Sequence, residues 1–424
     1  MTEPAQESRQ ERLGWIVVGT TFVTLGMVYG IWYSYSVFLV AFLREFGWSR
    51  SLVAGVFSTF VLVHGVLGPL NGWLAARVGP RWIILTGGGL LGVGLLLVAE
   101  TRVWWHLYAA FGGVVALGVA CAGWVPSIIL VRSWFPDRVG TALGVASAGI
   151  GIGITGLVPL AQFLVNSLGW RWAYRILGGL VMMWIIPSTL WLIREPPEVG
   201  LQPAPGCDRA TAPQAAYWTL ATAVRDWHFW GLAAVFSSGN IATQMLLVHQ
   251  IAYLVDYGVP AMAAAAVGGV VGLASIPAKV GWGALSDRVN REVAYSLAFA
   301  CVVLSIVALV LAGSYPHSPI PYIYAVLIGF GYAATAPLTP AAASDLFSGP
   351  KFSLIFGTLH VSNALGASAG AWIGGQVFDR TGSYFFAFGL ALVMAVFSAS
   401  LLWIVAPRRP HPPPSRAKYP MTHS

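Results

Sequence analysis

The chain has 424 residues, of which 57% are hydrophobic and only 9% are charged, and it contains 49 glycines. This composition excludes a soluble globular domain. The formal net charge of +8 raises nucleic acid as a partner. The basic residues, however, are distributed as membrane topology requires, so no nucleic-acid partner is predicted.

Apolar runs of about twenty residues or more predict twelve transmembrane spans. Backbone groups in the bilayer core have no water to bind, so such runs form either helices or a closed barrel. The runs lack the alternation of apolar and polar residues that barrel strands show, which favours helices. We therefore expect an all-α membrane protein with twelve transmembrane helices, and in chain order these are 14–42, 52–76, 82–100, 104–131, 140–165, 173–193, 227–255, 262–285, 293–313, 320–344, 353–378 and 384–406.

The basic residues predict the orientation of these helices. With an inner N-terminus, sixteen Lys and Arg residues fall in the inner loops and tails and six in the outer loops, while Lys279 lies within a span. This positive-inside pattern places both termini in the cytoplasm. The polar segment Met1–Arg12 is not followed by a cleavage pattern, so the first span is expected to stay in an integral protein of the plasma membrane, the inner membrane of a bacterium.

The longest polar stretch between spans divides the chain. It contains several prolines and predicts a cytoplasmic linker over 196–226 between two six-helix bundles, 1–195 and 227–406. The proline-rich segment 407–424 is expected to be a disordered cytoplasmic tail. The three cysteines are scattered, so neither a disulfide framework nor a metal site is predicted, and nothing indicates a cofactor.

The two halves repeat a pattern. The segment Gly72–Arg77, between the second and third spans, matches Gly283–Arg288, between the eighth and ninth, at an offset of 211 residues. A second pair, Gly169 and Gly382, matches at an offset of 213 residues. Two parallel repeats of this kind are typical of transporters, whose substrate site lies near the midplane between the repeats.

Lys279 is the one formal charge inside its apolar run, which extends from Ala261 to Leu285. A cation at this depth costs a few kcal/mol or more unless water, a pore or a counter-charge receives it. The fifteen acidic residues lie near the ends of apolar runs or in loops, so this cation suits a site that binds an anion. Snorkelling is the alternative, because Leu285 is only six residues away, about 9 Å at helical rise.

The repeated Gly-x-Leu-x-x-Arg segments resemble the loop signature of the major facilitator superfamily. The resemblance implies that fold, with Arg and Asp side chains pairing across the cytoplasmic helix ends. The first copy has Ala76 where the family has Asp, so a charge-paired gate is expected to be weaker in the first half. The residues that we assign to gating are Arg77, Arg81, Arg138, Asp287, Arg288, Gly144 and Gly149.

Small residues follow one another along the fifth span at three- and four-residue spacing. They are Gly144, Ala148, Gly149 and Gly153. Small side chains let helix backbones approach closely. The stripe is either ordinary helix packing or a seam that slides during alternating access, and the two interpretations are compatible.

Three longer segments are similar to the monocarboxylate transporters of that superfamily. They are Gly14–Ser51 in the first helix and outer loop, Trp134–Gly149 entering the fifth helix, and Asp345–Gly357 in the turn before the eleventh. The resemblance covers most of the chain apart from the linker and the tail. It implies a monomeric carrier of small carboxylates in the lipid bilayer, with proton symport as the usual coupling.

In that family, helix eight carries an Asp and, four residues later, an Arg that binds the substrate carboxylate. Ser275 and Lys279 stand at these positions. Lys keeps the charge but loses the bidentate fork of Arg, and Ser275 removes a counter-ion and a candidate proton carrier. The family's Lys in helix one corresponds to Tyr33, whose phenol either donates a hydrogen bond to a carboxylate or packs within the bundle.

Three histidines within spans are candidates for substrate binding or proton transfer. We favour His360, because helix eleven faces the cavity in this fold and Asn363 lies near the same face. His249 ranks next and His64 last. The bland alternative for each is a hydrogen bond to a neighbouring helix.

Two aromatic residues of the tenth span complete the candidate site. Phe330 and Tyr332 lie among glycines and alanines. They either cover the apolar part of a substrate or pack in the core.

The expected function is a secondary transporter that moves a small organic anion, a monocarboxylate such as lactate or pyruvate, by alternating access. With Ser275 in place of the acid, proton symport would need His360, His249 or an exchanged anion. The alternatives are a permease or exporter for another organic acid, or a sensor on the same scaffold that transports nothing. A membrane enzyme is not expected, because the sequence has no clustered acids, zinc motif, Ser/His/Asp set or phosphate loop.

Overall fold

The computed structural model describes residues 3–135, 139–193, 218–347 and 351–405, and these form helices without a strand. The first half contains α1 (Glu3–Phe46), α2 (Arg50–Val78), α3 (Pro80–Ala99), α4 (Trp104–Leu107), the π-helix η1 (Tyr108–Val115), α5 (Ala116–Ala122), α6 (Trp124–Trp134), α7 (Val139–Leu168) and α8 (Trp170–Trp191). The second half contains α9 (Leu220–Ala223), α10 (Trp227–Asp256), α11 (Ala261–Arg288), α12 (Arg291–Ser314), α13 (Ile320–Ala333), α14 (Thr335–Leu346), α15 (Phe352–Thr381) and α16 (Phe385–Val405).

Two of the predicted spans are broken into shorter helices. The fourth span, Trp104–Trp134, consists of α4, η1, α5 and α6. The tenth, Ile320–Leu346, consists of α13 and α14. Pro337 has no N–H to donate to the carbonyl of Ala333, which explains why the helix is interrupted near that point.

The described residues include eleven spans that are long and apolar enough to cross a membrane. The remaining predicted span, the eleventh in chain order, corresponds to α15, which is 30 residues long. It packs against α10 of its own half and α2 of the other half. The prediction of an all-helical protein with two repeated bundles is therefore confirmed, and the polar residues of α15 lie where the two halves meet.

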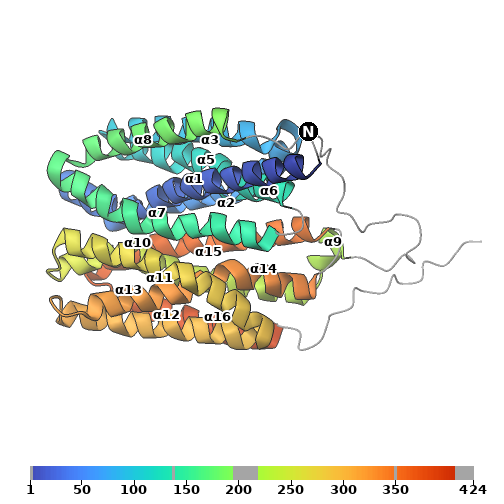
Figure 1. The fold of residues 1–424 in the computed structure, drawn as a ribbon. Coiled ribbons are helices and arrows are strands. Elements are labelled where there is room, and N and C mark those ends of the chain that lie inside the picture. The colour runs from blue at the N-terminus through green and yellow to red at the C-terminus, as the bar shows by residue number, and fades with distance from the viewer. Residues whose placement is uncertain (1–2, 136–138, 194–217, 348–350, 406–424) are drawn as a thin grey trace, which may run out of the picture.

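Figure 1 shows the two halves as layers of nearly parallel helices, with α1–α8 above α10–α16. We call the end that carries the start of α1 and the helix α9 the terminal end, and the opposite end, with the α7–α8 turn, the distal end. The halves contact each other mainly through α2 with α15, α7 with α11, and α1 with α10.

Glycines with positive φ make the tight turns at the distal end. Gly47 (φ 64°) follows α1 and Gly258 (φ 92°) follows α10, and they are 211 residues apart. Gly169 (φ 81°) and Gly382 (φ 69°) follow α7 and α15. Glycine adopts this backbone region without the strain that a Cβ brings. The equivalent turns of the two halves thus share the offsets of the sequence repeat.

Of the predicted linker, residues 218–226 are described and contain α9. The side chain of Thr219 accepts a hydrogen bond from the Thr222 N–H and caps this helix. Asp226 then caps α10 by accepting a bond from the His228 N–H at 2.8 Å. Residues 196–217 of the linker, and the predicted tail over 407–424, lie outside the described residues.

Candidate functional site

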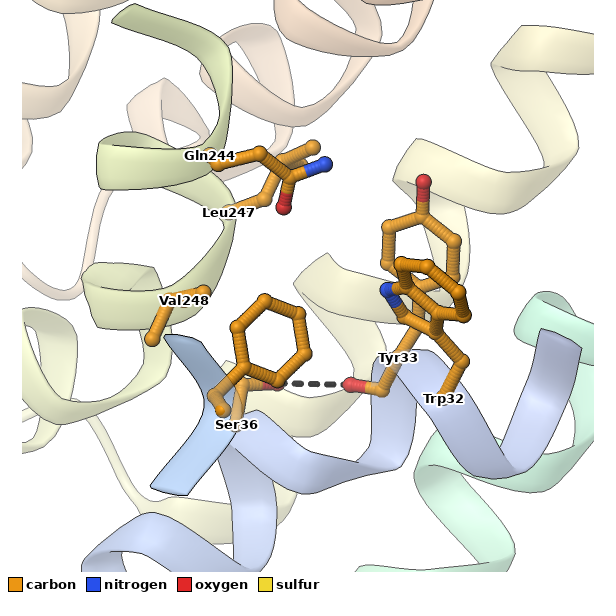
Figure 2. A pocket seen from close by; sticks show the side chains of 7 residues that line it. Trp32, Tyr33, Ser36, Gln244, Leu247 and Val248 are labelled. Atoms are coloured by element: carbon orange, nitrogen blue, oxygen red, sulfur yellow. Dashed lines mark hydrogen bonds between the residues drawn. The ribbon is translucent and has the colours of Figure 1, made fainter. Parts of the chain in front are cut away.

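A narrow pocket lies between α1 and α10, at the contact of the two halves (Figure 2). The free volume of the pocket is about 10 Å³, which is room for about one water-sized group. Trp32, Tyr33 and Ser36 approach from α1, and Gln244 extends from α10 toward the two aromatic rings. The other lining residues are Phe57 of α2 with Leu247 and Val248 of α10.

Two buried polar atoms of this pocket have no hydrogen-bond partner among the described residues. They are the indole nitrogen of Trp32 and the amide oxygen of Gln244. The two residues are 7% and 9% exposed. Burying a polar group without a partner costs free energy, so native cores rarely leave such groups unpaired. Two of them in one pocket therefore point to a place where a ligand or water binds.

Tyr332 connects this pocket to α11. Its ring lies 6.2 Å from the ring of Tyr33, and its hydroxyl is flanked by Tyr33 and Ser275. Ser275 is fully buried and donates a hydrogen bond to the carbonyl oxygen of Gly272 at 2.7 Å. The structure thus brings together Tyr33, Tyr332 and Ser275, three residues predicted for the site.

Lys279 lies one helical turn beyond Ser275, on the terminal side, and is partly buried. Among the described residues no hydrogen bond or ion pair reaches its ammonium group. Asp256 and Asp379 lie at the distal end, where they contact Arg50. Lys279 is therefore a cation with no counter-ion among the described residues, one helical turn from Ser275.

His360 and Asn363 project from α15 beside the same junction. The amide of Asn363 donates to the Nδ1 atom of His360 at 3.2 Å, and Asn240 of α10 donates to the Asn363 oxygen at 2.6 Å. His360 is exposed even though α15 packs between α2 and α10, so its ring faces open space at the contact of the halves.

His64, the least favoured histidine, lies in the same region. Its ring meets the ring of Trp32 edge-on at 4.9 Å, and it is close enough to His360 for the two charges to interact. The spacing of residues within one helix could not predict this position of His64, because the residue that it contacts, Trp32, lies on another helix.

His249 and Phe330 lie in different surroundings. His249 is fully buried, and its two ring nitrogens are bonded to the Tyr384 hydroxyl at 3.1 Å and the Ala371 carbonyl at 2.8 Å. The carbonyl of Phe330 accepts a bond from the indole nitrogen of Trp282 at 2.8 Å. These contacts hold helices of the second half together, and His249 stands apart from the group around Tyr332.

Comparison with known proteins gives the family. The profile of the Major Facilitator Superfamily matches residues 21–348 and 299–422. The chain belongs to this superfamily. It is 26% identical to "Monocarboxylate transporter 13" of Rattus norvegicus over 378 residues, covering 89% of this chain and 85% of that protein. It is 28% identical to "Monocarboxylate transporter 3" of Rattus norvegicus over 382 residues, covering 89% and 76% of the two chains.

A solved structure is also similar in fold. It is a bacterial homologue of the human lysosomal transporter Spinster in an inward-facing and unoccupied conformation. The TM-score is 0.66 at 15% identity, over 92% of this chain and 95% of that one. The resemblance to monocarboxylate transporters is thus confirmed, and the chain is an integral membrane transporter of the Major Facilitator Superfamily rather than an enzyme.

The residues that we assigned to gating each make different contacts. Arg81 donates to the carbonyls of Thr189 and Leu190 at 3.1 and 2.6 Å, so it joins α3 to α8 within one half. Arg77 lies 4.1 Å above the ring of Trp73. Arg288 is exposed in the last turn of α11. The side chain of Asp287 and all of Arg138 lie outside the described residues.

The glycines of α7 divide between two neighbours. A Cβ at Gly149 or Gly153 would collide with the backbone of α1, at Phe22 or Gly26, so these two glycines pack the first half. Gly144 has no neighbour within 4 Å. Gly151, which the stripe did not include, faces the other half: a Cβ there would meet the Ile276 side chain and lie 2.9 Å from the Gly272 oxygen.

A cluster at the distal end, which we call the distal latch, joins the halves and was not predicted. The latch comprises Arg50 and Ser51 of the first half with Asp256, Asp379 and Tyr384 of the second. The Asp379 carboxylate accepts bonds from the N–H groups of Arg50 and Ser51 at 2.8 and 2.7 Å. The Arg50 guanidinium reaches Asp256 at 2.7 Å and the Tyr384 hydroxyl at 2.7 Å.

Proposed function

We propose that this transporter moves a small organic anion, a monocarboxylate such as lactate or pyruvate, by alternating access. The observation that carries the proposal is Lys279, a partly buried cation in α11 with no counter-ion among the described residues. An uncompensated charge within a membrane span is costly, and a bound anion would remove that cost. The similarity to monocarboxylate transporters supports the same class of substrate.

In this proposal the carboxylate binds the ammonium group of Lys279. The hydroxyls of Tyr33 and Tyr332 lie beside Ser275, one turn away, and would donate hydrogen bonds to the carboxylate. Hydrogen bonds that involve a charged group contribute about 1.5–3 kcal/mol. A site with one formal charge and two phenols suits a single carboxylate.

The contacts between the halves suit alternating access. The distal latch closes one end, while His360 is exposed at the centre. Under the predicted topology the distal end is outside, so the arrangement corresponds to an inward-facing state. Transport would require the latch to open while the terminal end closes, as two repeats rock about a central site.

Replacing Lys279 tests the substrate site. In thermal-shift titrations of the purified protein with acetate, lactate and pyruvate, we expect the carboxylates to stabilise the wild type. K279A should weaken their binding by about ten- to a hundredfold, the equivalent of ~1.5–3 kcal/mol. K279R should keep part of the affinity, because it keeps the charge.

The variant should fold, since it leaves no partner unpaired. K351A is the matched control, because Lys351 is exposed at the start of α15. Equal binding by wild type and K279A would show that Lys279 is not the anion site. Counterflow of labelled lactate in proteoliposomes then separates a transporter from a sensor, which would bind the acid without moving it.

Proton symport is the second part of the proposal. The Ser275 hydroxyl does not titrate near neutral pH, and the described titratable groups of the centre, besides Lys279 and the tyrosines, are His360 and His64. We assign the proton to His360, which is exposed and, among the described residues, has a side-chain hydrogen bond only at Nδ1. Uptake by proteoliposomes should alkalinise the outside, and H360Q should abolish this while counterflow remains. Uptake without alkalinisation in the wild type would rule out symport.

A further inference from the structure

The pocket between α1 and α10 contains an unpaired donor and an unpaired acceptor. The donor is the indole N–H of Trp32, and the acceptor is the amide oxygen of Gln244. Both side chains line the pocket, and Figure 2 shows Gln244 extending across it toward Trp32 and Tyr33. The two groups come from different halves of the protein, so a ligand group that binds between them contacts both halves.

We propose that this pocket binds a hydroxyl group of the transported acid, and that Trp32 and Gln244 select hydroxy acids. The inference rests on the proposed function and narrows its substrate class. A hydroxyl accepts one hydrogen bond and donates another at the same time. It therefore satisfies both buried groups, accepting from Trp32 and donating to Gln244.

Other small groups satisfy the pair less well. A keto oxygen accepts from Trp32 but has nothing to donate, so the Gln244 oxygen stays unpaired. A methylene satisfies neither group. Sites with buried polar groups discriminate strongly against analogues that leave those groups unpaired. The order of preference is thus hydroxy acid, then keto acid, then the unsubstituted acid.

The remaining walls suit the same ligand. Phe57, Leu247 and Val248 are apolar, Ser36 donates its hydroxyl to the Tyr33 carbonyl at 2.9 Å, and the pocket is narrow. None of the described residues that line it is charged, so an ionised carboxylate would have no counter-charge there. The pocket accommodates one small neutral group, while the carboxylate belongs at Lys279.

Tyr33 links the two subsites. It lines the pocket, and its ring lies 6.2 Å from that of Tyr332, whose hydroxyl adjoins Ser275. In this proposal a single small molecule reaches from Lys279 to the α1–α10 pocket along these two tyrosines. The separation of its carboxylate and hydroxyl has to match this path.

Matched acids test the inference. Apparent Kd values are measured by thermal-shift titration for three pairs: propanoate with 2-hydroxypropanoate, butanoate with 3-hydroxybutanoate, and butanoate with 4-hydroxybutanoate. In at least one pair we expect the hydroxy acid to bind about tenfold more tightly, as two neutral hydrogen bonds allow. The pair with the largest ratio gives the distance between the subsites.

Two variants connect this preference to the pocket. Q244L removes the acceptor at similar size, and W32F removes the donor; each should reduce the ratio to nearly one. Q162L is the matched control, because Gln162 is a buried glutamine of α7 bonded to Asn166. It should leave the ratio unchanged.

The outcomes separate the two proposals. If acids bind but no hydroxyl improves binding, the pocket holds only water and this inference is wrong. A Q244L variant that weakens every acid equally would give Gln244 a structural role and would also overturn it. If no acid binds the wild type, the proposed function itself fails.

Discussion

At the centre of the site, a charged residue has no oppositely charged residue beside it on the same helix. Lys279 has no acid beside it, and the residue one turn earlier is Ser275, which is buried and bonded to Gly272. In the proposed site, the free charge of Lys279 provides the attraction for the carboxylate. Supplying the missing acid should therefore lower that affinity.

We predict that S275D weakens carboxylate binding at neutral pH. A carboxylate one turn from Lys279 would neutralise it, and a pair at this distance interacts by about 1.4 kcal/mol or more, which is at least tenfold in Kd. An Asp ordinarily has a pKa of about 3.9, and the ion pair with Lys279 favours its charged form, so the loss of affinity should persist between pH 7.5 and 5.5. Thermal-shift titrations with lactate at both values measure this. S275N, which has the same size but no charge, should bind lactate more tightly than S275D at both values, and equal behaviour of the two variants would contradict the prediction.

Some of these residues follow from the sequence and others do not. Lys279 is visible because a charge in an apolar run is rare, and Tyr332 because it is an aromatic residue among glycines and alanines. Trp32 and Gln244 carry no such signal, since an indole and an amide are common in helices and their importance depends on facing each other. His64 illustrates the same limit, because its place beside Trp32 and His360 depends on packing between helices.

Helix α7 shows how one element serves both the bundle and the contact between bundles. Gly149 and Gly153 lie against α1, whereas Gly151 lies against α11. The spacing of small residues predicts that α7 packs closely, but it does not tell which neighbour each face meets. The breaks in the fourth and tenth spans are similarly hard to predict, since the apolar runs continue through them.

We predict different effects for alanine at these glycines. G153A places a Cβ against the Gly26 carbonyl within the first half, so it should lower the melting temperature; overpacking of this kind costs about 1–3 kcal/mol. G151A collides instead with Ile276 and Gly272 across the halves, so it should disfavour the state with the distal end closed. G156A is the control, because nothing lies within 4 Å of that position.

Two measurements distinguish these effects. Thermal unfolding reports the stability of each variant, and the distance between spin labels at Leu168→Cys and Tyr315→Cys reports the separation of the halves at the distal end. Both positions are exposed. A G151A variant with the wild-type distance distribution would show that the α7–α11 contact does not control the conformation.

At the scale of the whole molecule, the two halves are joined most specifically at the distal latch. Arg50 lies 3.8 Å from the centre of the Phe378 ring in addition to its polar contacts. Its side chain is 14% exposed, and that of Asp256 is 34% exposed. The Asp379 carboxylate also sits at the N-terminus of α2, where the helix dipole favours a negative charge. A carrier that alternates between two states has to break all of these contacts in each cycle.

We predict that R50A opens the distal end. The substitution removes the ion pair with Asp256, the bond to Tyr384 and the contact with Phe378, and it leaves Asp256 without its partner. For a partly exposed pair we expect a loss of about 1–3 kcal/mol, which shifts the equilibrium between closed and open distal ends by about ten- to a hundredfold. R50K should have a smaller effect, because it keeps the charge but cannot bridge two acceptors.

The distance between spin labels at positions 168 and 315 measures this opening and should become longer and more broadly distributed in R50A. The control is R102A, which removes an exposed arginine of the same end and should leave the distances unchanged. Identical distributions in wild type and R50A would mean that the contacts between α2 and α15 and between α7 and α11 suffice to hold the distal end closed.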